Sequence, residues 1–141
     1  MMYLDTNIFV YAIENHPEYG KKAKRILEDA EKGKIKGCAS MLVLVELLNV
    51  LNKINRVLKD SDKKELDLKE IITAVESMPI TWFDLNFLII EKAAEYSYMV
   101  NAIDYIHIAT MELNSVREIA SADRDLDRVD LVKRVDPMEY T

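Results

Sequence analysis

The chain has 141 residues, of which half are hydrophobic, and it contains 3 Gly, 3 Pro and one cysteine, Cys38. This length predicts a single domain over residues 1–141, and the scarcity of Gly and Pro excludes flexible linkers and a turn-rich all-β fold. A lone cysteine excludes an internal disulfide, and the net charge of -6 argues against binding of nucleic acid through overall charge.

Strand and helix signals alternate along the chain. Ser40 is suited to cap the helix that follows it, and Pro79 to stop the next one. Asp84 is expected to cap a further helix, and Asn101 to form a capping box with Asp104. The expected strands cover residues 2–5, 36–39, 80–83, 117–121 and 131–135, and the expected helices cover residues 17–33, 41–58, 66–78, 84–100 and 101–113. This alternation predicts an α/β domain with a mostly parallel sheet.

The start of the chain and its apolar stretches predict a cytoplasmic protein. No basic segment precedes the first apolar residues, and Asp5 interrupts them too early for a signal peptide. Every apolar stretch is shorter than 10 residues, whereas a helix that spans a bilayer needs about 20. We therefore expect no membrane segment.

Basic residues gather in two stretches in spite of the acidic total. The ordinary interpretation of such stretches is a solvated helix face. The alternative is a surface that contacts phosphates, because net charge does not describe how charge is distributed. The two groups are Lys21, Lys22, Lys24, Arg25, Lys32, Lys34 and Lys36, and Lys53, Arg56, Lys59, Lys63 and Lys64.

Four carboxylates interrupt or close apolar segments of the chain: Asp5, Glu46, Asp104 and Asp123. Burying a charged carboxylate among aliphatic side chains is unfavourable unless a cation, a helix N-terminus or a metal compensates it. Ligands of open parallel sheets bind outside the carboxyl ends of the strands, and all four positions are compatible with one such edge. The pattern therefore predicts one shared site.

Each of these acids also has a local structural explanation to be weighed. Asp104 fits the inner half of a capping box, Asp123 fits a turn, and Asp5 fits an Asx-turn. Glu46 has no such explanation, because it lies inside residues 41–48 with apolar neighbours and no helix end nearby. If its role is structural, a partner elsewhere in the fold must compensate its charge.

Taken together, the four acids favour a metal site. Converging carboxylates raise one another's pKa unless a divalent cation keeps them ionised. Oxygen ligands without Cys or a well-placed pair of His select Mg²⁺ or Mn²⁺ over Zn²⁺. Metal-assisted hydrolysis of a phosphodiester is the chemistry that follows. We expect Asp5, Asp104 and Asp123 to be the main ligands, and Glu46 to be a ligand or the group that positions or deprotonates the attacking water.

Four short motifs occur in a fixed order along nearly the whole chain. They are Leu4-Asp5-Thr6-Asn7, Ser40 with Glu46 six residues on, Ala102-Ile103-Asp104 leading into Ile106-His107-Ile108-Ala109, and Ser121-Ala122-Asp123. In combination they resemble the motifs of the PIN-domain ribonucleases. Within that family the chain is most similar to the VapC-type toxins of type II toxin–antitoxin pairs. The match is weakest over about residues 59–79.

The resemblance implies a three-layer α/β/α fold with Mg²⁺- or Mn²⁺-dependent cleavage of single-stranded or loop RNA. The catalytic quartet that it implies consists of Asp5, Glu46, Asp104 and Asp123. Thr6, Asn7 and Ser121 would be supporting polar groups, with Ser121 at a position where the family more often has Thr. An antitoxin that inserts a segment into the acidic groove is a possible partner. We also expect a homodimer, which would bring two sets of basic residues around one groove.

Two residues near the acids have more than one interpretation. His107 lies one turn after Asp104 and would face the site, although a partly buried helix histidine is the commoner use of such a position. Arg124, next to Asp123, is the preferred contact for a substrate phosphate.

Other polar and aromatic residues are better explained by structure than by function. Asp125 and Asp127 are more consistent with a solvated turn than with peripheral ligands. Tyr96 and Tyr98 are suited to stack on bases, but packing in the core or at a dimer surface is the simpler use.

Three alternatives to a toxin remain open at this point. One is a PIN-type nuclease that processes RNA without an antitoxin. Another is a phosphoryl-signalling domain, which normally needs an acidic pair after its first strand, whereas Thr6 and Asn7 follow Asp5 here. The third is a non-catalytic binding module, for which a set of mutually repelling acids has no use.

Overall fold

Five short strands form one parallel sheet in the computed structural model of the chain, which describes residues 1–141. The strands are β1 (Met2–Leu4), β2 (Gly37–Ser40), β3 (Thr81–Phe83), β4 (Glu118–Ala120) and β5 (Lys133–Val135). Their order in the sheet is β3-β2-β1-β4-β5, so β1 is central. All carboxyl ends lie along one edge because the strands run the same way. The predicted α/β class with a parallel sheet is confirmed.

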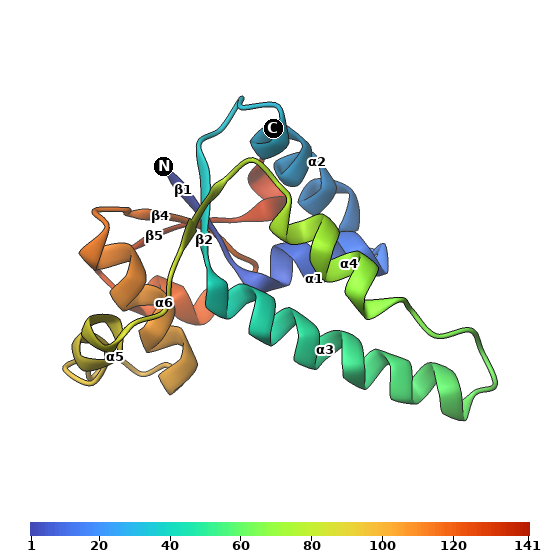
Figure 1. Ribbon diagram of the computed structural model, residues 1–141. Helices are drawn as coiled ribbons and strands as arrows, with labels where there is room; N and C mark the ends of the chain where they lie inside the picture. The colour runs from blue at the N-terminus through green and yellow to red at the C-terminus, as the bar shows by residue number, and fades with distance from the viewer.

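Helices cover both faces of this sheet, which gives the expected three layers (Figure 1). The helices are α1 (Thr6–Glu14), α2 (Gly20–Glu31), α3 (Met41–Asp60), α4 (Leu68–Glu76), α5 (Phe87–Ala93) and α6 (Ala102–Leu113), with 3₁₀ turns η1 (Arg124–Arg128) and η2 (Pro137–Glu139). In Figure 1, α1, α2 and α4 lie on one side of the strands and α5 and α6 on the other, while α3 starts beside the sheet and extends away from it. No helix is long and apolar enough to cross a membrane.

The two layers of core arise from the alternation of side chains along each strand. Leu4 and Ala120 point to the side of α1, α2 and α3, where they pack in a cluster with Ile8, Ile26 and Leu47. The preceding residues of the same strands, Tyr3 and Ile119, point to the other side and pack against α6. Because successive side chains in a strand face opposite ways, three apolar residues in a row serve both layers.

The sequence patterns placed several element boundaries correctly. Ser40 caps α3, with its hydroxyl accepting a hydrogen bond of 3.0 Å from the Leu42 amide. Asn101 caps α6 in the same way, through a bond of 3.0 Å from the amide of Asp104. Both caps fix helices that begin at the carboxyl edge of the sheet or close to it.

The prediction missed α1 and began the next helix too early. Residues 8–13 are almost uninterruptedly apolar, so no polar face reveals a helical period. The helix ends at Asn15, which adopts a left-handed conformation with φ 52°. Its successor begins at Gly20 rather than Pro17, and a side chain at Gly20 would lie 2.9 Å from the backbone of Asn15. The turn between α1 and α2 therefore requires glycine at this position.

The helix predicted over residues 84–100 is wrong in both its cap and its length. Asn86, not Asp84, accepts the capping bond, which is 3.1 Å from the amide of Ile89. The helix ends at Ala93, and the chain then turns so that Tyr96 and Tyr98 pack against Tyr105 of α6. Tertiary contacts between aromatic rings thus shorten a helix that local pattern would extend.

Candidate acidic site at the carboxyl edge of the sheet

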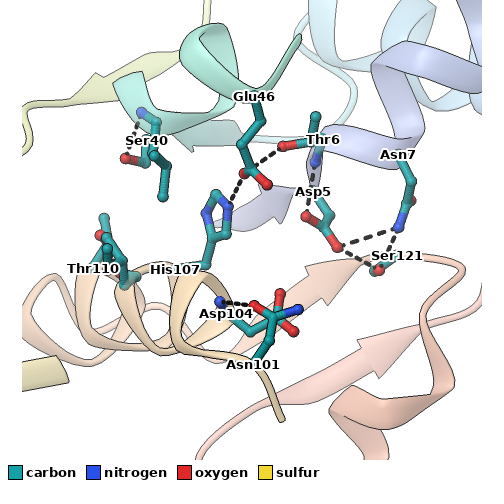
Figure 2. Close-up of polar contacts among 12 residues, drawn as sticks. Asp5, Thr6, Asn7, Ser40, Glu46, Asn101, Asp104, His107, Thr110 and Ser121 are labelled. Atoms are coloured by element: carbon teal, nitrogen blue, oxygen red, sulfur yellow. Dashed lines mark hydrogen bonds and ion pairs between the residues drawn. The ribbon is translucent and has the colours of Figure 1, made fainter. Parts of the chain in front are cut away.

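Asp5 follows the central strand and is the most buried of the four acids, with 9% of its surface exposed. Its Oδ1 accepts a hydrogen bond of 2.8 Å from the amide of Thr6, which caps α1. Its Oδ2 accepts bonds from the Ser121 hydroxyl at 2.6 Å and the Asn7 amide at 3.3 Å. Both carboxylate oxygens are therefore held by the protein, as Figure 2 shows for the Oδ2 contacts.

Asn7 and Ser121 join the ends of β1 and β4. The Asn7 amide donates to the Ser121 hydroxyl oxygen over 3.0 Å, and its Oδ1 accepts a bond of 3.3 Å from the amide of Ala122. Ser121 in turn accepts a bond of 3.1 Å from the amide of Asp123. Residues separated by more than a hundred positions thus fix Asp5 and Asp123 relative to one another.

Glu46 reaches the site from the second turn of α3. Its Oε1 accepts a bond of 2.9 Å from the Thr6 hydroxyl and lies 2.5 Å from Nε2 of His107. These contacts are the partners elsewhere in the fold that the sequence required, and no partner lies on α3 itself. The structure shows no protein donor to Oε2.

Asp104 and Asp123 occupy helix starts, as their local explanations predicted, but most of their carboxylate oxygens remain free. Asp104 uses only its backbone amide in the cap, so the reciprocal half of the capping box is absent. Asp123 caps η1 through Oδ1, which accepts a bond of 3.0 Å from the amide of Asp125. Capping therefore does not account for either oxygen of Asp104 or for Oδ2 of Asp123.

Of the four acids that interrupt or close apolar segments, only Asp5 is buried. Glu46, Asp104 and Asp123 are half-buried, and the Glu46 side chain keeps 31% of its surface exposed. Apolar neighbours along α3 misled the prediction, because Val45 and Leu48 themselves face solvent. The acids line the rim of the sheet, where water reaches them, rather than its core.

Mutual repulsion and burial perturb these carboxyl groups. Burial, followed by the charges of Asp5 and Asp123, raises the pKa of Asp104 to about 6. Burial likewise raises the pKa of Asp5, against the lowering effect of His107 and Ser121. Desolvation would raise the pKa of Glu46, but the bonds from His107 and Thr6 outweigh it and hold the pKa below its usual value.

The donor set suits a hard divalent cation. The carboxylates of Asp5, Glu46 and Asp104 lie around one space in Figure 2, and a cation there would relieve the repulsion that adds to burial in raising the pKa of Asp104. No three acidic, histidine or cysteine side chains are arranged to hold an ion as they stand. The residues fit a metal by their chemistry, and binding would require the free carboxylates to move inward.

Sequence patterns did not identify Tyr3 and gave no decisive role to His107. His107 is 2% exposed, so it is a buried helix histidine, and it also faces the acids. Its Nδ1 lies 2.5 Å from the Tyr3 hydroxyl, while its Nε2 contacts Glu46. The alternation of side chains in β1, which puts Tyr3 on the α6 side, was the one signal available for this contact.

The outer residues of the site are placed as follows. Arg124 is exposed beside Asp123 at the start of η1. Asp127 forms a two-pronged ion pair with Arg134, whose guanidinium also donates to the carbonyl of Ser121 over 3.0 Å. Arg134 therefore braces the β4 end, a role that sequence reasoning missed, and Asp127 is engaged away from the acids.

Basic residues of the second stretch lie far along α3. A helix rises about 1.5 Å per residue, so Lys59 lies about 20 Å from Glu46 along the axis. In Figure 1 this end of α3 is remote from the strand ends. One copy of the chain thus does not place these cations beside its own acids.

Comparison with known proteins identifies the family. The PIN domain family matches residues 2–132, and no curated protein matches the sequence. Among solved structures, VapC20 of Mycobacterium tuberculosis, a toxin that cleaves the sarcin–ricin loop, is similar with a TM-score of 0.71 and 16% identity over 94% of this chain and 97% of that one. VapBC2 of Rickettsia felis, bound to a promoter DNA fragment, gives a TM-score of 0.67 and 20% identity over 96% and 98%. A toxin–antitoxin complex from Klebsiella pneumoniae gives 0.68 and 16% over 97% and 98%. The chain therefore belongs to the PIN-domain family, the family of nucleases that its motifs resemble.

Proposed function

We propose that the protein is a metal-dependent endoribonuclease that hydrolyses RNA phosphodiester bonds. The observation that carries this proposal is the convergence of Asp5, Glu46, Asp104 and Asp123 from four segments, close enough for the other three to raise the pKa of Asp104, with free oxygens on three of the four. Repulsion between carboxylates destabilises a fold, whereas several converging carboxylates are what a catalytic site for phosphate chemistry needs. Hydrolysis assisted by a metal needs no protein nucleophile, so we assign water as the attacking group.

Asp5, Asp104 and Asp123 would hold Mg²⁺ or Mn²⁺. A bound cation of this kind lowers the pKa of a coordinated water and neutralises charge on the phosphate oxygens. Asp5 is fixed by Thr6, Asn7 and Ser121, so it gives the site a rigid centre. Glu46 would orient the attacking water or complete the ligand set, and Arg124, exposed at the start of η1, would contact a substrate phosphate.

A cleavage assay tests this proposal. Purified protein is incubated with a set of end-labelled structured RNAs in Mn²⁺, in Mg²⁺ and in EDTA. We expect cleavage at discrete positions with either metal and none in EDTA. Asp104→Asn is the matched variant, because its carboxylate makes no protein contact that folding requires; we expect a loss of at least about 100-fold in rate.

Two controls make the result decisive. Glu65→Gln changes an exposed acid outside the site and outside the apolar surface on α3, and it should cleave like the wild type. Cleavage by Asp104→Asn at the wild-type rate, or cleavage in EDTA, would show that a contaminant or another site is responsible. Absence of cleavage of every RNA with both metals would favour the non-catalytic binding module instead.

We infer that the protein is the toxin of a toxin–antitoxin pair. Two of the similar structures are toxin–antitoxin complexes, and each is matched over nearly its whole length. The gene should then lie beside a small open reading frame. Co-expression of that product should suppress the cleavage of RNA and copurify with the chain, whereas a processing nuclease would have no such inhibitor.

The chain would act as a homodimer through an apolar surface beside the site. Met41, Val45 and Leu48 form an exposed stripe on α3 at positions that share one helix face. Leu85 shares a groove with Met41 and Val45, and Phe87 beyond it is 86% exposed. Since Val45 adjoins Glu46, a second copy on this surface would set two acidic sites side by side.

A further inference from the structure

We propose that His107 is a positioning residue of this site, held by Tyr3, that fixes Oε1 of Glu46 and so leaves Oε2 as the oxygen offered to water or substrate. The proposal deepens the nuclease function above and rests on it for its catalytic part. It does not rest on that function for its structural part, which concerns the protein without metal. Figure 2 shows His107 and Glu46 pointing at one another from α6 and α3.

The hydrogen-bond inventory fixes which atom of His107 carries a proton. A carboxylate with an ordinary or lowered pKa only accepts, so Nε2 must donate over the 2.5 Å to Glu46. Nδ1 then faces the Tyr3 hydroxyl, which is also 2.5 Å away and can donate to it. In the neutral ring the Tyr3 hydroxyl donates to Nδ1 and the proton stays on Nε2, whereas in the cationic ring both nitrogens carry a proton. In either state Nε2 donates to Glu46.

Both donors to Glu46 converge on one oxygen. The Thr6 hydroxyl, 2.9 Å away, and His107 both bind Oε1, and no protein group binds Oε2. Two fixed donors on one oxygen set the plane of the carboxylate and the direction of the other oxygen. The two hydrogen bonds thus restrict the rotation of the Glu46 side chain, although it lies at the rim of the sheet.

The burial of the pair explains why the arrangement is rigid. Tyr3 is fully buried and His107 is 2% exposed, so water does not compete for their bonds. The two rings meet edge to face with centroids 5.6 Å apart, which fixes the tilt of the imidazole. Loss of a residue that orients a catalytic group through a hydrogen bond typically lowers activity by about 10- to 100-fold.

Nitrogen NMR of the metal-free protein tests the structural part. The chain has 2 histidines, so His107→Gln assigns the spectrum by loss of one ring. We expect a protonated Nε2 on His107 in the wild type at neutral pH, and a smaller fraction of this form in Tyr3→Phe, which keeps the ring but loses the hydroxyl. An Nε2 without a proton in the wild type would overturn the proposal.

Kinetics of three variants test the catalytic part. His107→Gln keeps an N–H at the distance of Nε2 from the backbone, whereas His107→Leu has none. We expect His107→Leu to lower kcat by about 10- to 100-fold with KM within about threefold, and His107→Gln to restore most of the loss. Tyr3→Phe should lower kcat by less than His107→Leu does. Urea unfolding of each variant separates these effects from lost stability.

The failures of the two proposals are distinguishable. Equal kcat in the wild type and in folded His107→Leu would overturn the positioning role and leave the nuclease intact. If His107→Leu does not fold, an unchanged ring form and an unchanged kcat in Tyr3→Phe would overturn it instead. A wild type that cleaves no RNA would sink the nuclease proposal, while the ring form of His107 would still be decided by NMR.

Discussion

At the scale of single residues, the carboxyl groups of the site differ in how firmly they are held. Asp5 has donors on both oxygens, Glu46 and Asp123 have donors on one, and Asp104 has none. The fewer donors a carboxyl group has, the more freely it can rearrange around a cation, so Asp5 would move least and Asp104 most. Asp104 is the group with most to gain, since its charge is opposed by its neighbours and stabilised by no hydrogen bond.

Asp104→Asn should stabilise the metal-free protein. The pKa of Asp104 is raised from 3.8 to about 6, so the folded state binds its proton more tightly than the unfolded state does. Ionisation of this group therefore lowers the stability as the pH rises from 3.8 to about 6, with the full cost above that range and none below 3.8. After allowance for solvent screening of a half-exposed group, we expect a gain of roughly 1 kcal/mol at pH 7 in the variant.

Urea unfolding in EDTA at pH 7 and pH 4.5 measures this effect. The gain should shrink at the lower pH, because the wild-type carboxyl is then largely protonated in the folded state. Asp84→Asn, at an exposed position, should show no gain at either pH. A metal-free Asp104→Asn less stable than the wild type at pH 7 would contradict the repulsion inferred here.

Bound metal should make the wild type more stable than Asp104→Asn. Mg²⁺ or Mn²⁺ binds the folded wild type and should raise its Tm, by an amount equivalent to about 2.7 kcal/mol at a hundred times the Kd. Asp5→Asn and Asp104→Asn should lose this shift, which thermal unfolding with and without metal measures. The same shift in both variants would exclude these acids as the ligands.

At the scale of elements, the N-terminal caps of helices position the acids in addition to fixing where the helices begin. Asn101 caps α6 nearly two turns before His107 and directly before the turn that carries Asp104. Ser40 likewise starts α3, which carries Glu46 two turns on. A cap at a fixed residue determines the rotation of the helix, and so the direction of each side chain in it.

Asn101→Ala should cost about 1 kcal/mol of folding free energy, since it removes the side-chain acceptor for the amide of Asp104. Asn101→Ser keeps a capping oxygen and should stay close to the wild type. Chemical denaturation measures both. Should the alanine and serine variants be equally unstable, a contact other than the cap must be responsible.

At the scale of the whole molecule, α3 links the acidic site to an apolar surface. Its first turns carry Glu46 on one side and the stripe of Met41, Val45 and Leu48 on another. The exposed start of α5 extends this surface, with Phe87 and Leu88 among its side chains. Exposed apolar surfaces of this kind mark interfaces more often than free solvent faces.

Val45→Glu should therefore convert a dimer to a monomer, and Leu88→Glu should do the same from the α5 side. The matched control is Val57→Glu, which introduces the same charge at a 65% exposed position further along α3. Analytical ultracentrifugation over a range of concentrations measures the effect. A monomeric wild type, or a Val57→Glu variant that also dissociates, would refute this surface as the interface.

The sequence by itself determined the class of fold and the order of the chemistry along the chain. Alternating strand and helix signals predicted a parallel sheet, because strand residues with apolar side chains on both faces require cover on both. Caps at Ser40 and Asn101 are local interactions, so local pattern predicts them. The positions of the four acids, just after strands or in early turns of helices, are also a property of sequence alone.

Only the tertiary structure decided what these acids contact and how exposed they are. The bonds of Glu46 to Thr6 and His107 span 40 and 61 positions, and no local pattern encodes them. Half-burial of three acids follows from where the sheet ends and α3 departs from it, which depends on the packing of whole layers. The helix α1 and the early end of α5 were missed for a related reason: a helix without a polar face, and one stopped by ring packing, are defined by their neighbours in space rather than in sequence.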